Sequence, residues 1–311
     1  MASGQERILR RRIRSINSTK KITRAMELIA GSRIVRAQAR VHAAAPYADQ
    51  ITQVVRDLAA AGGTASNSPY LVPRPEIRKV AYVVIAADRG LCGGYNSSVI
   101  RAAEGAMREH NALGRDYELI VVGRKVEGYF RYRDYRIASA HSGFSDQPTY
   151  EDARAVAAAV EAPFLAGDVD LVVLVYTRFV SAGSQEVVVR PLIPLDQETF
   201  ERVEAHEGVS PDYEFEPGPA EILEDLLPRY AEARVYAALL NAAASEHAAR
   251  QRAMKSATDN AEDLITSLTR VMNRARQDAI TTEIMEVVGG AEALRTGDSM
   301  HTSTEPPQYA A

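Results

Sequence analysis

The chain has 311 residues, of which 46% are hydrophobic and 25% charged, with a formal net charge of −4, the composition of a soluble folded protein with one large domain or two ordinary ones. No apolar run approaches the roughly 20 residues that a membrane-spanning helix needs. The single cysteine, Cys92, excludes an internal disulfide and fits a reducing compartment.

The charges are distributed unevenly along the chain. Residues 1–40 hold eleven arginines and lysines against two glutamates, whereas residues 196–225 hold eleven acidic residues against one arginine. One part of the molecule is therefore basic and another acidic, which favours docking to partners of opposite charge.

The first predicted element is a long amphipathic helix over residues 1–61. Its apolar residues recur at mostly three- to five-residue steps, which approximates the narrow a/d stripe of a coiled coil. They are Ile8, Ile13, Ile16, Ile22, Met26, Ile29, Ile34, Ala37 and Val41. Pro46 can kink this helix, because a proline removes one helical hydrogen bond. A flexible linker is expected over residues 62–76.

Residues 77–199 are predicted to form a Rossmann-like α/β domain, because strand patterns alternate with helical patterns. Three short, nearly continuous apolar runs are typical of buried strands in a parallel sheet. They are residues 80–87, 117–122 and 169–176. Helical patterns lie between them at residues 97–111 and 150–165. Residues 185–194 are expected to form an edge strand, where Pro191 is tolerated.

An acidic connector over residues 200–219 precedes the last predicted helix, residues 220–294. After Pro228 nothing breaks this helix until Gly289-Gly290, so it would extend roughly 90 Å at about 1.5 Å per residue. So long a helix needs a partner, because helices gain most of their stability from packing an apolar face. We therefore expect it to pair antiparallel with the N-terminal helix, and we expect residues 295–311 to be a disordered tail. The candidate seam residues are Leu223, Leu227, Tyr230, Leu239, Ala243, Ala257, Ala261, Leu264, Leu268, Val271, Ala275, Ile280, Ile284 and Val287.

Residues 88–96 (DRGLCGGYN) lie between a predicted strand and a helix, where α/β proteins bind phosphate. They lack the spacing and the lysine of a P-loop, so the sequence favours a tight turn with Asn96 as N-cap. Cys92 has no histidine near it in sequence and is interpreted as a buried or half-exposed thiol rather than a nucleophile.

No other motif predicts chemistry. The histidines lack zinc-site spacing, and His247 is interpreted as part of a solvated helix face. The basic N-terminal helix has no interleaved aromatic residues for base stacking, which favours a solvated face or an acidic protein partner over nucleic acid. Glu283 and Glu286 share a helix face, but a helix tip offers no pocket to shift their pKa values, so partner contact is favoured. The residues alone indicate a structural or transmission protein.

Five segments in the same order along the chain resemble the γ subunit of the F-type ATP synthase, the central rotor shaft. They are residues 15–27 (SINSTKKITRAME), 88–93 (DRGLCG), 213–217 (YEFEP), 254–260 (MKSATDN) and 280–283 (ITTE) with Glu286 and Gly290-Ala291. The resemblance covers residues 3–294. It implies an antiparallel coiled coil that projects into a ring of alternating α and β subunits, with the α/β domain near the membrane beside the ε subunit and the ring of c subunits.

The resemblance also implies a function. The chain would couple proton-driven rotation of the c ring to ATP synthesis in its neighbours, without an active site, cofactor or metal of its own, at the cytoplasmic face of a bacterial cell membrane and without inserting into it. Contacts with the α and β subunits would fall on Met26, Arg250, Arg276, Gln277, Thr281 and Glu283, and contacts with the c ring and ε on Tyr213, Phe215 and Glu216. The alternatives are an unrelated coiled-coil scaffold and an α/β enzyme with helical arms.

Overall fold

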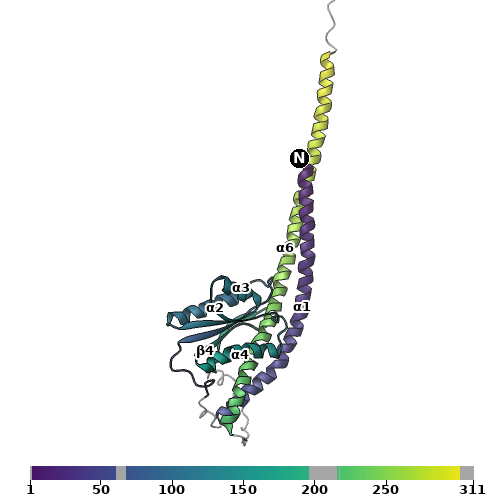
Figure 1. The fold of residues 1–311 in the computed structure, drawn as a ribbon. Coiled ribbons are helices and arrows are strands. Elements are labelled where there is room, and N and C mark those ends of the chain that lie inside the picture. The colour runs from purple at the N-terminus through teal and green to yellow at the C-terminus, as the bar shows by residue number, and fades with distance from the viewer. Residues whose placement is uncertain (1, 61–67, 196–215, 217, 302–311) are drawn as a thin grey trace, which may run out of the picture. The chain divides into compact units, whose positions relative to one another are not determined.

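The computed structural model describes residues 2–60, 68–195, 216 and 218–301. It divides into two compact units, one made of Met1–Ala25 with Lys255–Ala311 and the other of Met26–Met254. Two long helices contribute to both units, α1 (Ala2–Ala60) and α6 (Pro219–His301) (Figure 1). Among the described residues, no helix has the length and apolarity to cross a bilayer.

The second unit contains a five-stranded sheet in the order β3-β2-β1-β4-β5. The strands are β1 (Lys79–Ile85), β2 (Asp116–Val122), β3 (Ile137–His141), β4 (Leu171–Phe179) and β5 (Gln185–Ile193). β1 pairs in parallel with both β2 and β4, β2 pairs in parallel with β3, and β5 pairs antiparallel with β4 at the edge. The predicted parallel strands and the predicted edge strand are therefore confirmed, and β3 was not predicted.

Helices cover both faces of this sheet. They are α2 (Tyr95–Ala112), α3 (Arg124–Tyr132) and α4 (Tyr150–Ala166), together with α6. Figure 1 shows α2 and α3 on one side of the sheet and α4 on the other. Val80, Tyr82 and Val84 of β1 pack towards α2 and α3, whereas Ala81 and Val83 pack towards α4 and α6. β1 reads as one continuous apolar run because both of its faces are buried.

The buried stripe of α1 differs from the prediction. Ile22 and Ile29 are 61% and 55% exposed, whereas Thr23 is 9% exposed, Glu27 9% and Ala30 1%. Of the predicted stripe Ile34 is buried, at 4% exposed, but small and polar side chains take the places expected for Ile22 and Ile29. Small residues let two helix backbones approach closely.

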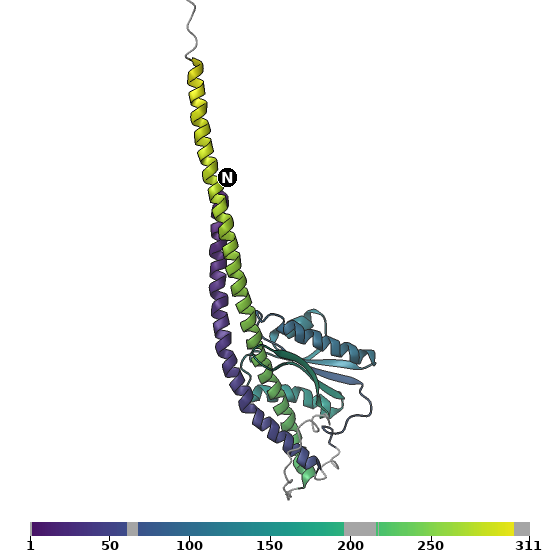
Figure 2. The same ribbon diagram turned by 180° about the vertical axis from the view of Figure 1, so that it is seen from behind.

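α1 and α6 run antiparallel in the first unit. The hydroxyls of Thr23 and Thr258 are hydrogen-bonded at 2.8 Å, and Lys20 Nζ lies 3.2 Å from Glu262 Oε1. A residue further along α1 thus meets one earlier in α6. Within the second unit the two helices again lie side by side (Figure 2).

The last part of α6 has no neighbour in α1 at this register, because Ala2 would lie level with about residue 280. The apolar residues along this stretch are correspondingly exposed, although several were predicted to form the seam. They are Ile280 49%, Ile284 56%, Met285 68%, Val287 67% and Val288 59%. The predicted seam residues Leu264 and Val271 are 52% and 47% exposed although they lie level with α1. The predicted seam residues Leu223, Leu227 and Tyr230, near the start of α6, are fully buried.

The ends of α6 also differ from the prediction. The helix includes Pro228, passes through Gly289-Gly290 and continues to His301, beyond the predicted end at residue 294. A glycine costs a helix only about 1 kcal/mol, which does not end a helix when no competing cap follows. The rest of the predicted tail, residues 302–311, lies outside the described residues, as does most of the predicted connector. In the same way α1 continues through Pro46 to Ala60.

Candidate functional site

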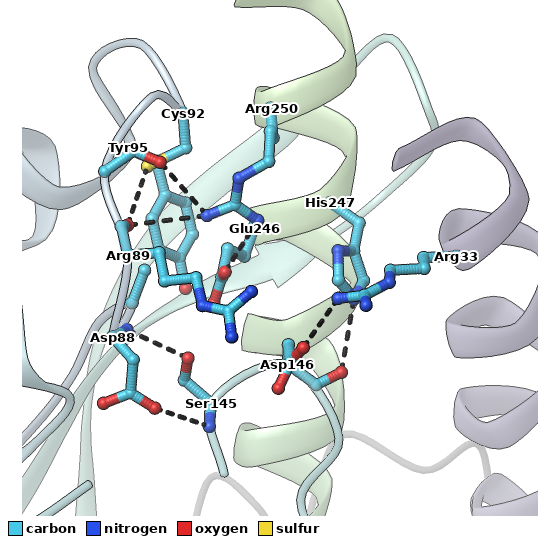
Figure 3. Close-up of polar contacts among 12 residues, drawn as sticks. Arg33, Asp88, Arg89, Cys92, Tyr95, Ser145, Asp146, Glu246, His247 and Arg250 are labelled. Atoms are coloured by element: carbon cyan, nitrogen blue, oxygen red, sulfur yellow. Dashed lines mark hydrogen bonds and ion pairs between the residues drawn. The ribbon is translucent and has the colours of Figure 1, made fainter. Parts of the chain in front are cut away.

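Asp88 holds the turn between β1 and α2 in place. Its carboxylate accepts hydrogen bonds from the backbone N–H groups of Gly143 at 2.8 Å and Arg124 at 3.1 Å. It also accepts one from the backbone N–H of Ser145 at 3.2 Å (Figure 3). Burial raises the pKa of Asp88, but these hydrogen bonds to the charged form outweigh burial, so the pKa lies below its usual value. The lowered pKa favours the ionised form of Asp88, which holds the turn through these hydrogen bonds.

Asn96 does not cap α2, contrary to the sequence interpretation. The N-cap residue is Gly94, and Asn96 Oδ1 instead accepts a hydrogen bond from the backbone N–H of Ala87 at 2.9 Å. Cys92 is 1% exposed, which matches the expected buried thiol. Burial raises the pKa of its thiol, which disfavours the thiolate that a nucleophile requires.

A buried ion pair joins α6 to this turn. Arg250 Nη1 lies 2.8 Å from Glu246 Oε1, and the two side chains are 11% and 2% exposed. Arg250 Nη2 donates to the carbonyl oxygens of Arg89 at 3.4 Å and Gly90 at 3.3 Å (Figure 3). Burial raises the pKa of Glu246, and Arg250 offsets only part of this rise.

His247 is 2% exposed, so its interpretation as part of a solvated helix face was wrong. Its Nε2 lies 3.2 Å from the carbonyl oxygen of Asp146, whose carboxylate pairs with Arg33 of α1 at 2.7 Å. Burial lowers the pKa of His247, which keeps the ring neutral. The helix here is rich in alanine and packs closely on all sides, which is how Glu246 and His247 become buried.

These contacts border a pocket of about 320 Å³ in the second unit, which we call the Met26 pocket. It is lined by Met26, Ile29, Ala30, Arg33, Arg89, Gly90, Leu91, Asp146, Glu246, His247 and Arg250. Leu91 is 63% exposed, and with Met26 and Ile29 it gives the pocket an apolar rim. Arg33 and Arg250 are paired with carboxylates, and among the described residues Arg89 has no ion-pair partner. An apolar rim beside an unpaired cation suits an acidic, partly apolar protein segment.

Of the residues that the sequence singled out, Met26 and Arg250 meet in this pocket. Arg276, Gln277, Thr281 and Glu283 belong to the other unit, where all four are exposed on α6.

Of the residues expected to contact the c ring and ε, Glu216 is exposed, and Tyr213 and Phe215 lie outside the described residues. Sequence reasoning missed Arg89, Leu91, Glu246 and His247. The four-residue spacing of Glu246 and Arg250 was the available signal for the ion pair. No group of His, Cys, Asp or Glu side chains within the described ranges could hold a metal ion.

Comparison with known proteins defines the class. A family model described as ATP synthase matches residues 5–294. Two solved structures share the fold. A chain of the central stalk and c-ring structure of the Tetrahymena thermophila mitochondrial ATP synthase is 27% identical, with a TM-score of 0.57 over 76% of this chain and 99% of that one. A chain of the rotor of the Euglena gracilis mitochondrial ATP synthase is 17% identical, with a TM-score of 0.63 over 89% of this chain and 99% of that one.

The curated relatives narrow the class further. The chain is 53% identical to the ATP synthase gamma chain of Frankia casuarinae, over 95% of this chain and 99% of that one. It is 49% identical to the gamma chain of Mycolicibacterium smegmatis, over 93% and 97%. The chain belongs to the family of bacterial ATP synthase gamma chains.

Proposed function

We propose that the chain is the central-stalk rotor subunit of a bacterial ATP synthase, which couples proton-driven rotation of the c ring to ATP synthesis in the α and β subunits and performs no catalysis itself. The observation that carries the proposal is similarity to ATP synthase gamma chains over nearly the whole length of both chains. No described feature favours an unrelated scaffold.

The stalk would be an antiparallel coiled coil of α1 and α6. The Thr23–Thr258 and Lys20–Glu262 contacts support this arrangement. The end of α6 would then turn inside the ring of α and β subunits. Its exposed apolar side chains support this placement, because an exposed apolar stripe of this kind marks an interaction surface. Beside the stripe, Arg276, Gln277, Thr281 and Glu283 would form hydrogen bonds that change as the shaft turns.

The Met26 pocket would meet the β subunit. Its apolar rim and the unpaired Arg89 fit an acidic loop, and Arg250, already held by Glu246, would present a fixed positive charge beside it. Tyr213, Phe215 and Glu216 would face the c ring and ε, an assignment that depends on the family resemblance. The subunit would lie at the cytoplasmic face of the cell membrane as a peripheral part of the complex.

A rotor that transmits rotation to catalytic subunits needs no chemistry of its own. It needs contacts whose free energy differs between the rotational states. Arg276→Ala and Glu283→Ala should each lower proton-driven ATP synthesis by the reconstituted complex about tenfold, since a hydrogen bond to a charged group contributes about 1.5 kcal/mol. The circular dichroism of the isolated chain should not change, because both side chains are exposed.

Arg108→Ala and Glu109→Ala, two exposed charge deletions on α2, serve as matched controls and should leave synthesis unchanged. Normal coupling in both Arg276→Ala and Glu283→Ala would contradict the contact assignment. An α and β assembly that hydrolyses ATP equally well without this chain would contradict the rotor proposal itself.

A further inference from the structure

A second pocket, of about 440 Å³, lies at the carboxyl ends of β1 and β4, which we call the switch-point pocket. It is lined by Cys92, Gly93, Gly94, Tyr95, Ser98, Thr177, Gln185, Val187, Ala249, Arg252 and Ala253, and it shares none of these residues with the Met26 pocket. The chain continues from β1 to β2 on one side, while β4 lies on the other side of β1. Open α/β sheets bind ligands in the crevice outside the carboxyl ends of the strands at such a change of direction.

The N-terminus of α2 contributes to the wall of this pocket. The helix is 18 residues long, its N-cap is Gly94, and no side chain caps it. The two α2 residues that line the pocket, Tyr95 and Ser98, donate their N–H groups to the carbonyl oxygens of Cys92 at 3.2 Å and Gly94 at 2.9 Å. The N-terminus of the helix carries a partial positive charge. No acidic residue lies in this first turn to neutralise that charge. This dipole would favour an anion in the pocket.

An unpaired hydroxyl points independently to a ligand. Thr177 of β4 lines the pocket and is 4% exposed, and its hydroxyl has no hydrogen-bond partner among the described residues. Strand alternation places Thr177 on the same face as Val173 and Val175, which pack beneath α2. A buried hydroxyl without a partner costs free energy, so an acceptor from a ligand would stabilise the site.

The lining of the pocket carries only positive charge. Arg252 is its one charged residue, and no carboxylate lines the pocket. The Arg252 guanidinium is held by hydrogen bonds to the carbonyl oxygen of Ala182, at 2.8 Å, and to Gln185 Oε1. A guanidinium fixed in this way retains further donors, which match the oxygens of a phosphate. Arg252 comes from α6, far along the chain, so the absence of a P-loop lysine from the turn does not exclude phosphate.

We propose that the switch-point pocket binds a phosphate group, either as inorganic phosphate or as the phosphate of a small phosphorylated metabolite. Arg252 donates to the phosphate oxygens, the dipole of α2 favours their negative charge, and the hydroxyl of Thr177 gains the acceptor that it lacks. The volume lies within the range of small-molecule sites, and Val187, Ala249 and Ala253 offer apolar contact to a non-phosphate part. This site is additional to the rotor function and does not depend on it.

The test uses the full chain in calorimetric titrations and thermal melts. Inorganic phosphate, added against sodium chloride of equal ionic strength, should raise the unfolding midpoint in a saturable way, because a ligand that binds only the folded state stabilises it. Titrations with AMP and adenosine distinguish inorganic phosphate from a phosphorylated metabolite as the ligand. If AMP binds more tightly than inorganic phosphate and adenosine does not bind, the ligand is a phosphorylated metabolite. If AMP and inorganic phosphate bind equally, the pocket recognises only the phosphate group, and the ligand is inorganic phosphate.

Three variants test the residues. Arg252→Gln should weaken phosphate binding about tenfold, whereas Arg108→Gln, the matched charge deletion on the exposed surface of α2, should not. Ser98→Asp places a carboxylate near the helix N-terminus, so the midpoint without phosphate should hold or rise while the phosphate response disappears. Thr177→Val removes the unpaired hydroxyl. If this hydroxyl has only a structural role, the variant should have a higher unfolding midpoint and unchanged phosphate binding. The proposal requires that the variant also bind phosphate more weakly.

Two results would overturn the proposal. One is a wild-type chain whose midpoint responds to phosphate no more than to chloride. The other is a phosphate response that survives unchanged in Arg252→Gln and Ser98→Asp, which would identify an adventitious ion on the surface. If Arg252→Gln itself lowers the midpoint, Ser98→Asp alone decides between the outcomes.

Discussion

Replacing Arg250 by methionine should destabilise the second unit strongly. The substitution leaves the Glu246 carboxylate, 2% exposed, without the guanidinium that lies 2.8 Å from it. Removing one partner of a buried ion pair costs about 3–5 kcal/mol, because the remaining charge is buried uncompensated. The hydrogen bonds from Arg250 to Arg89 and Gly90 are 3.3–3.4 Å long and should add little. We expect a loss of about 3 kcal/mol in the free energy of unfolding at pH 8.

The loss should depend on pH in a defined direction. Burial already raises the pKa of Glu246, and Arg250 lowers it, so the substitution raises this pKa further. When the folded pKa of a carboxyl exceeds its unfolded pKa, the stability it contributes is present below the unfolded pKa and is lost as the pH rises through the folded pKa. The deficit of Arg250→Met should therefore shrink towards pH 5.

Urea unfolding followed by circular dichroism at pH 5 and pH 8 measures both quantities. The double variant Glu246→Gln with Arg250→Met is the control, because it leaves no buried charge and should be more stable at pH 8 than the single variant. Wild-type stability in Arg250→Met, or a deficit of equal size at the two pH values, would refute the reasoning.

Two further predictions concern the α/β fold. Gly123 has φ of +106°, and a Cβ there would lie 2.3 Å from the carbonyl oxygen of Ala86, so Gly123→Ala should cost about 3 kcal/mol or more in urea unfolding. Gly128 has open space within α3, so Gly128→Ala should instead stabilise by about 0.5–1 kcal/mol, and similar effects of the two substitutions would contradict the described turn. Burial, and to a smaller extent the nearby Glu232, raise the pKa of Glu161 from 4.5 to about 7. The stability that Glu161 contributes is therefore present below pH 4.5 and is lost as the pH rises through 7. Glu161→Gln should flatten the fall in melting temperature between pH 5 and pH 8, and an unchanged slope would show that Glu161 does not titrate there.

The central strands could be predicted from the sequence because helices cover both of their faces. β1 is therefore an unbroken apolar run. β3 could not be predicted in this way, since it lies at the edge of the sheet and its residues alternate between half-buried and exposed. α3 was missed because it is nine residues long, contains Gly128, and buries only Val126 and Phe130.

The candidate site was harder to predict. Met26 and Arg250 came from family resemblance, and their meeting in one pocket depends on the turn at residues 89–91, which no periodicity predicts. His247 was read as solvated because a histidine on a helix is usually exposed. Its burial depends on a loop more than a hundred residues earlier, where Asp146 provides the carbonyl oxygen.

The exposed apolar end of α6 also affects how much of the chain a cell can accumulate. Ile284, Met285, Val287 and Val288 lie close together on a helix that nothing else in the described chain covers, each more than half exposed. Apolar surface of this kind promotes aggregation, and a helix end without tertiary packing opens readily to proteases. In the proposed complex, other subunits would cover this end. Copies made in excess of those subunits should be degraded, so the abundance of the chain would be set by its rate of assembly rather than by its rate of synthesis.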